Sequence, residues 1–134
     1  MGSAQTASSL NILVVEDDEN LRLSIIDALR GCGYLVRGID CAAALPKKND
    51  FLPLDLAVLE VDLPDESGFS LAQRMRVAKP ELGVILLSAR ATPEDPTPGY
   101  VQGADIYLTK PVSLGELDEA VSALARRLRT KRAP

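Results

Sequence analysis

Three short runs of the chain are apolar without interruption, and this feature restricts the fold most. They lie in NILVVEDD (11–18), DLAVLEV (55–61) and GVILLSA (83–89). Strands that are apolar on both faces are typical of a parallel sheet covered on both sides by helices. Two weaker strand patterns, YLVRGI (34–39) and ADIYLTKP (104–111), complete a set of five. Five strands that alternate with helices predict an α/β fold, a doubly wound parallel sheet with right-handed connections.

The segments between the predicted strands carry start and stop signals for helices. Apolar residues recur at helical spacing over 21–29, and GCG ends that helix. The segment GFSLAQRMRVA (68–78) predicts another helix, and a capping box of Ser113 and Glu116 begins the last one. The segment CAAAL is expected to begin a helix that Pro46 ends early, because proline lacks the N–H that a helix needs.

The length of 134 residues suits a single domain with one core. We expect this domain to occupy residues 11–128, after a disordered leader over 1–10. The basic stretch 129–134 is expected to be a tail or the start of a linker. No apolar run is long enough to span a bilayer and the start has no signal-peptide pattern, so we expect a cytoplasmic protein without a membrane partner.

The composition argues against several classes of function. The chain has two cysteines, Cys32 and Cys41, and no histidine. Zinc sites and catalytic Cys–His pairs are therefore not expected. We also expect that the chain is not an enzyme. The net charge of -4 gives no signal for nucleic-acid binding by the whole chain. A glycine-rich loop of the GxxxxGK type is missing from the sequence, which disfavours a nucleotide triphosphatase.

Polar residues gather where the predicted strands end. The first strand is followed by Glu16, Asp17 and Asp18, the third by Glu60 and Asp62, the fourth by Ser88, and the fifth by Lys110 and Pro111. Because the carboxyl ends of parallel strands meet at one edge, we expect these side chains to lie together. Oxygen ligands alone suit Mg²⁺, and a lysine with a hydroxyl suits a phosphoryl group. Taken singly, each residue has an ordinary explanation, such as a helix cap at Asp18 or a turn at Ser88.

These motifs resemble the receiver domain of two-component response regulators. The segments ILVVEDD, DLAVLEVDLPDESG, VILLSAR and GADIYLTKPVSLGEL lie in that family's order and spacing, and the resemblance covers residues 11–128. It implies a flavodoxin-like (CheY-like) fold of five strands with helices on both faces. It also implies phosphorelay signalling, in which a histidine kinase supplies a phosphoryl group to an aspartate of the receiver.

The resemblance further implies roles for residues of this chain. The phosphoacceptor position falls on Glu60, where the family pattern has aspartate. A shifted register with Asp62 as the acceptor is an alternative, although the LP pair and Gly68 fix the spacing. In the family pattern, Glu16 and Asp17 match the acidic pair that holds Mg²⁺, the backbone carbonyl of Asp62 a further metal ligand, Ser88 the switch hydroxyl, Tyr107 the switch aromatic, and Lys110 with Pro111 the Lys-Pro pair.

Glutamate at the acceptor position changes the expected chemistry. The extra methylene moves the carboxylate by about 1.5 Å, and a misplacement of about 1 Å can cost on the order of 10²-fold in rate. We therefore expect poor phosphorylation of Glu60, which argues against a histidine kinase as partner. Glu60 is expected to pair with Lys110 as a partial phosphoryl mimic, beside a weak or vestigial Mg²⁺ pocket at Glu16 and Asp17. Tyr107 is either a switch residue or a half-buried aromatic of an edge strand.

Three prolines, Pro93, Pro96 and Pro98, lie where the family has its fourth helix and are expected to break it, as Pro46 breaks the second. In the family, this helix, the last strand and the last helix form the face that signals outward or dimerises. The breaks put the usual dimer mode in doubt, and a homodimer through the last strand and last helix stays open.

Three functions are compatible with these features. The first is a phosphorylation-independent receiver that regulates an attached or partner output, expected to be transcriptional. The second is a conventional receiver with an engineered Asp-to-Glu change that imitates activation, although the broken helices argue against it. The third is a flavodoxin-like cofactor binder, which acidic loops and an aromatic content of 4% disfavour. We adopt the first.

Overall fold

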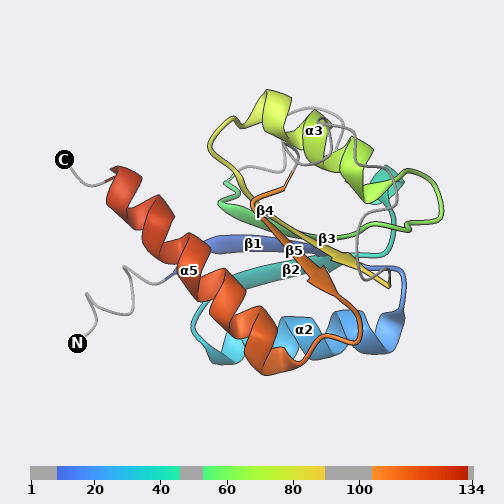
Figure 1. The fold of residues 1–134 in the computed structure, drawn as a ribbon, viewed down its shortest axis with the longest axis horizontal. Coiled ribbons are helices and arrows are strands. Elements are labelled where there is room, and N and C mark those ends of the chain that lie inside the picture. The colour runs from blue at the N-terminus through green and yellow to red at the C-terminus, as the bar shows by residue number, and fades with distance from the viewer. Residues whose placement is uncertain (1–8, 46–52, 90–103, 133–134) are drawn as a thin grey trace.

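The computed structural model describes residues 9–45, 53–89 and 104–132, which form a five-stranded parallel sheet with helices on both faces (Figure 1). The strands lie in the order β2-β1-β3-β4-β5. This confirms the doubly wound α/β architecture predicted from the apolar runs. The strands are β1 Asn11–Val15, β2 Leu35–Ile39, β3 Leu56–Glu60, β4 Gly83–Ser88 and β5 Ile106–Thr109.

Three α-helices are present in the described part of the chain: α2 Glu19–Gly31, α3 Gly68–Ala78 and α5 Leu114–Arg132. Helices α2 and α5 cover one face of the sheet and α3 covers the other (Figure 1). None of the described helices is long and apolar enough to cross a membrane. The predicted break of a fourth helix, at Pro93, Pro96 and Pro98, lies outside the described residues.

The CAAAL segment forms only a 3₁₀ helix, η1, over Ala42–Ala44. Its end agrees with the early stop expected before Pro46. Asp65, in the loop between β3 and α3, fixes this short helix. Its two carboxylate oxygens accept from the N–H of Ala42 at 3.1 Å and from the N–H of Ala43 at 2.7 Å. The loop after β3 is therefore tied to the segment after β2.

Capping side chains fix where the helices begin. Asp18 accepts from the N–H of Leu21 at 3.0 Å, so it is the N-cap of α2. At the start of α5, Ser113 Oγ accepts from the N–H of Glu116 at 3.0 Å. Glu116 Oε1 in turn accepts from the N–H of Ser113 at 3.1 Å, which confirms the predicted capping box. Helix α5 continues to Arg132, into the basic stretch after residue 128.

Two apolar layers lie on either side of the sheet. One packs under α2 and α5 and includes Ile25 and Val121. The other packs under α3 and includes Leu71 and Met75. Strand β3 lies in the middle of the sheet and all of Leu56–Glu60 is buried, which explains why its residues before Glu60 are all apolar.

The parallel register brings the strand ends to one edge. Glu60 at the end of β3 pairs with Leu87, and Ser88 at the end of β4 pairs with Thr109. Glu16, which follows β1, donates its N–H to the carbonyl of the last residue of β2 at 3.1 Å. The polar residues that follow the strands therefore share the carboxyl edge of the sheet, as predicted.

Candidate functional site

Lys110 lies between two buried carboxylates at the carboxyl edge of the sheet. Glu16 is completely buried and Glu60 is only 4% exposed. Lys110 Nζ is 3.0 Å from Glu16 Oε1 and also forms a close ion pair with Glu60 Oε1. Because the two glutamates come from β1 and β3 and the lysine follows β5, this cluster joins the ends of three strands.

The other oxygen of each glutamate is held by the backbone. Glu16 Oε2 accepts from the N–H of Asp18 at 3.0 Å. Glu60 Oε2 accepts from the N–H of Asp62 at 2.8 Å. The same arrangement thus occurs at the ends of β1 and β3, with one oxygen bound to the amide two residues later. The remaining oxygen of each glutamate, Oε1, faces Lys110 and pairs with its ammonium.

Burial and charge shift the proton affinities of this cluster. Burial raises the pKa of Glu16 to about 7, although the N–H of Asp18 and the Lys110 ammonium act to lower it. Burial acts to lower the pKa of Lys110, but hydrogen bonding and attraction to Glu60 and Glu16 raise it overall. Lys110 therefore stays charged and compensates the negative charge of the pocket.

The carboxylates at this edge fit a divalent cation. Glu16, Asp17 and Glu60 each offer an oxygen, and these oxygens lie within 4.8 Å of one another. Asp17 is exposed, whereas the two glutamates are buried. Such oxygens are the ligands that Mg²⁺ prefers. A cation that used all three carboxylates would have to displace Lys110 from two of them. Asp62, the other predicted metal ligand, is exposed just beyond β3.

The predicted switch residues lie on β4 and β5. Ser88 is completely buried, and its carbonyl accepts from the N–H of Lys110 at 2.6 Å. Tyr107 is half-buried and stacks on Phe69 of α3, with ring centroids 6.4 Å apart and planes inclined by 12°. Pro111 follows Lys110 through a cis peptide bond and is exposed. The structure thus brings Ser88 and Lys110 to the edge and places Tyr107 toward α3.

Gly68 lets α3 begin directly against the end of β3. A Cβ at this position would lie 2.4 Å from the carbonyl oxygen of Glu60 and 2.9 Å from Val61 Cα. The N–H of Gly68 donates to the carbonyl of Val61 at 2.8 Å. Only glycine permits this approach of backbone to backbone. The position of α3 is therefore coupled to the strand end that carries Glu60.

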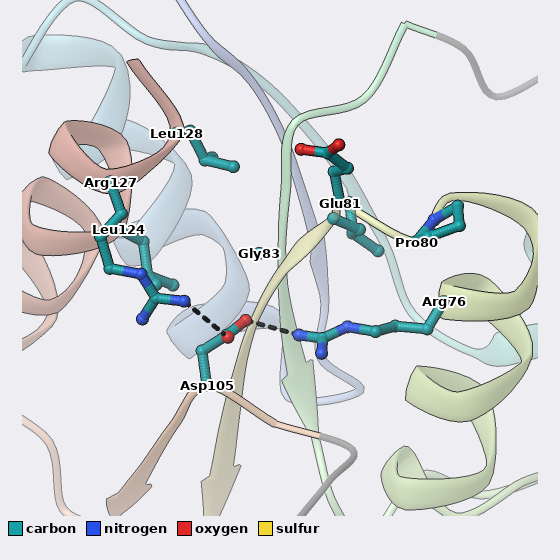
Figure 2. Close-up of a pocket in the computed structure, with 9 residues that line it drawn as sticks. Arg76, Pro80, Glu81, Gly83, Asp105, Leu124, Arg127 and Leu128 are labelled. Carbon is teal, nitrogen blue, oxygen red and sulfur yellow. Dashed lines mark hydrogen bonds and ion pairs between the residues drawn. The ribbon is translucent and has the colours of Figure 1, made fainter. Parts of the chain in front are cut away.

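A second charged cluster, which no sequence pattern indicates, lies at the opposite end of β5 (Figure 2). Asp105 Oδ2 accepts from Arg76 of α3 at 2.5 Å and from the N–H of Val84 at 2.8 Å. Its Oδ1 accepts from Arg127 of α5 at 3.2 Å. The cluster borders a cavity of about 50 Å³. Its members are far apart in sequence, so no spacing could reveal them. The contact of Phe69 with Tyr107 gives no sequence signal for the same reason.

The chain matches the family model of the response regulator receiver domain over residues 12–122. The transcriptional regulatory protein RprY of Bacteroides fragilis (strain YCH46) is 40% identical over 126 residues, which cover 92% of this chain and 52% of that protein. The transcriptional regulatory protein BasR of Escherichia coli (strain K12) is 38% identical over 118 residues, which cover 88% of this chain and 53% of that protein. The chain thus spans about half the length of these curated relatives.

Solved structures show the same architecture. The response regulator TrrA of Thermotoga maritima, solved in complex with Mg²⁺ and BeF, has a TM-score of 0.76 and 30% identity, covering 86% of this chain and 98% of that chain. A CheY-like receiver domain protein of Methanospirillum hungatei JF-1 has a TM-score of 0.79 and 25% identity, covering 92% of this chain and 98% of that chain.

The acidic cluster lies at the typical magnesium site of receivers. The matching family is one of signalling domains and not of catalytic enzymes. The sheet order, the charged carboxyl edge and the family match together show that this chain belongs to the response regulator receiver domain family.

Proposed function

We propose that this receiver regulates an attached or partner output without phosphorylation of an aspartate. One observation carries the proposal: both oxygens of Glu60, at the phosphoacceptor position, are already engaged. Oε2 accepts from the N–H of Asp62 at 2.8 Å, and Oε1 forms the ion pair with Lys110. Glu60 is also only 4% exposed, which fits a fixed internal anion better than a group presented to a phosphodonor.

An acceptor carboxylate must direct a free oxygen lone pair at phosphorus from a near-attack distance of roughly 3–3.5 Å. Each oxygen of Glu60 keeps one further lone pair, but a bond to phosphorus would reduce the charge that binds the Asp62 amide and the Lys110 ammonium, so these partners would rearrange. Lys110 would then be paired mainly with Glu16. The rearrangement adds to the barrier that the extra methylene already imposes.

Glu60 also acts as a partial stand-in for a phosphoryl group. It carries one negative charge, compared with roughly −1.5 to −2 for a phosphate. Lys110 is held at the carboxyl edge by this charge and by Glu16. Because Lys110 already compensates two of the three carboxylates, we infer that Mg²⁺ binds weakly through Glu16, Asp17 and the carbonyl of Asp62. When bound, the cation would neutralise charge at the phosphoacceptor position. We propose Ser88 and Tyr107 as the switch residues of this receiver, which would act without that trigger.

We further propose a cytoplasmic regulator whose output is transcriptional. The relatives named above are transcriptional regulatory proteins, and this chain spans about half of their length. The remaining half of such a protein would supply the output, and the basic end of α5 would lead into it. A homodimer that forms through β5 and α5 is an alternative to an attached output. A histidine kinase is not required.

Beryllofluoride binding tests the proposal at the site itself. NMR spectra of the chain are recorded with Mg²⁺, before and after beryllofluoride is added, for the wild type and for Glu60→Asp. We expect no shifts in the wild type and shifts around Asp62, Ser88 and Lys110 in Glu60→Asp, whose shorter carboxylate restores the family's acceptor. Saturable shifts of the same residues in the wild type would overturn the proposal.

A further inference from the structure

We propose that Phe69 is a positioning residue that holds the Tyr107 ring on the α3 side of the sheet and thereby couples β5 to the strand end that carries Glu60. The inference rests on the proposed function, since it describes how a receiver with a fixed anion keeps its switch aromatic in one orientation. Nothing in the sequence pattern distinguishes Phe69 from an ordinary residue in the first turn of a helix.

The first observation is the direction of Tyr107. Strand residues alternate between the two faces of a sheet. Ile106 and Leu108 pack into the apolar layer under α2 and α5, whereas Tyr107 packs into the layer under α3. There its ring stacks on Phe69, with centroids 6.4 Å apart and planes inclined by 12°. This offset parallel arrangement is one of the favoured geometries for an aromatic pair.

The second observation is that the backbone leading into Phe69 is held in place. Its N–H donates to Ser67 Oγ, the N-cap of α3, at 3.0 Å. The preceding residue, Gly68, lies so close to the Glu60 carbonyl that no Cβ could fit, and it donates to Val61 at 2.8 Å. The backbone from which the Phe69 ring projects is therefore fixed relative to the end of β3.

The third observation is that β5 is held at both ends. After its carboxyl end, Lys110 pairs with Glu16 and Glu60. Before its amino end, Asp105 pairs with Arg76 and Arg127, as Figure 2 shows. A strand of four residues that is anchored in this way cannot easily slide along β4. The remaining freedom of Tyr107 is rotation of its side chain, and Phe69 restricts that rotation.

Together these contacts form a closed circuit. It runs from Glu60 through the backbone of Val61 and Gly68 to Phe69, across the stacked rings to Tyr107, along β5 to Lys110, and back to Glu60. A change at Glu60 or Lys110 can therefore reach Tyr107 by two routes. If Phe69 only filled space, its replacement by another apolar side chain would leave the Tyr107 orientation unchanged.

NMR of the Tyr107 side chain tests the inference. Samples of the wild type, Phe69→Leu and Phe69→Tyr are labelled on tyrosine rings, and Tyr107→Phe assigns the signal. We expect a ring-to-ring nuclear Overhauser effect between residues 69 and 107 in the wild type and one dominant χ1 rotamer. In Phe69→Leu the odds of that rotamer should fall by about 2- to 10-fold, the factor that an aromatic pair contributes. Phe69→Tyr keeps the ring and should keep the rotamer.

Two results would overturn the inference. One is the lack of a contact between rings 69 and 107 in the folded wild type, a readout that does not require any variant to fold. The other is an unchanged Tyr107 rotamer in Phe69→Leu. All samples lack Mg²⁺ and phosphodonor, so the outcome does not depend on whether Glu60 can be phosphorylated. Phosphorylation of the wild type would refute the proposed function and leave this result standing.

Discussion

At the scale of single residues, two buried glutamates share one lysine. The types and places of Glu16, Glu60 and Lys110 are readable from the sequence, because each follows a predicted strand and parallel strands end at one edge. The hydrogen bonds that the two Oε2 atoms accept from backbone N–H groups cannot be predicted from the sequence, because they depend on the turn that follows each strand.

Removal of Lys110 should destabilise the fold, because the two buried carboxylates would lose their cation. In Lys110→Met, Glu16 and Glu60 remain buried without a cation, so we expect the free energy of unfolding to fall by about 3 kcal/mol. Lys79→Met, which changes a lysine at the end of α3, should alter it by less than about 0.5 kcal/mol. Urea unfolding measures both. The loss in Lys110→Met should shrink when Glu60→Gln is added, and a loss that stays the same would show that the pairing is unimportant.

The raised pKa of Glu16 predicts a dependence of stability on pH. An ordinary glutamate has a pKa of 4.5, whereas burial raises that of Glu16 to about 7. The folded chain therefore binds this proton more tightly than the unfolded chain. Its stabilising effect is complete below pH 4.5 and is lost as the pH rises through about 7, a decrease of at most about 3 kcal/mol.

Thermal unfolding between pH 5 and about 8 measures this decrease. Glu16→Gln should remove most of the slope while the fold is kept. The carboxyls of Asp65 and Glu66 have lowered pKa values, so their stabilising contributions are lost only at more acidic pH and leave this window clear. Stability that rises with pH across the window in the wild type would contradict the assignment.

At the scale of elements, the start of α3 and the ends of β5 determine how the site is supported. The existence of both elements follows from local sequence: alternating or continuous apolar residues for the strands, and helical spacing over 68–78. The contacts that hold these two elements in place do not follow from local sequence. Gly68 meets a backbone carbonyl eight residues earlier, and Asp105 meets arginines on two different helices, so both contacts belong to the tertiary structure.

Gly68→Ala should disturb the junction between β3 and α3. The added Cβ would lie 2.4 Å from the Glu60 carbonyl, which is backbone and cannot move away cheaply. We expect a loss of about 1–3 kcal/mol in the free energy of unfolding. The matched control is Gly31→Ala at the end of α2, where a Cβ would meet no described neighbour within 4 Å. That variant should be neutral or slightly stabilising, and equal losses in both would contradict the close approach.

Asp105→Asn should weaken the anchor at the amino end of β5. The carboxylate is 14% exposed and accepts from two arginines and one backbone N–H. Its neutralisation leaves Arg76 without its anion, so we expect a loss of about 2 kcal/mol or more. Glu66→Gln, which weakens the more exposed pair with Arg74, should cost less than about 1 kcal/mol. Urea unfolding compares the two, and a larger effect in Glu66→Gln would refute this ranking.

At the scale of the whole molecule, the order of the elements was predictable and the relation between its two charged clusters was not. The central strand β3 is apolar up to its last residue, Glu60, and the edge strand β2 is partly polar, as their positions in the sheet require. The clusters at Lys110 and at Asp105 lie beyond opposite ends of β5 and together connect it to β1, β3, α3 and α5. We infer that β5 is the element through which changes at the Lys110 cluster reach α3 and α5.

Phosphoryl transfer to the chain tests most directly whether a receiver with Glu60 in place of aspartate can be phosphorylated. The wild type and Glu60→Asp are incubated in parallel with Mg²⁺ and acetyl phosphate, and intact-mass spectrometry follows the adduct. We expect a phosphoryl adduct on Glu60→Asp and none on the wild type, because Glu60 is held by Lys110 and by the amide of Asp62. A stable adduct on the wild type, mapped to Asp62 or Asp17, would contradict it and show a working receiver with a displaced acceptor.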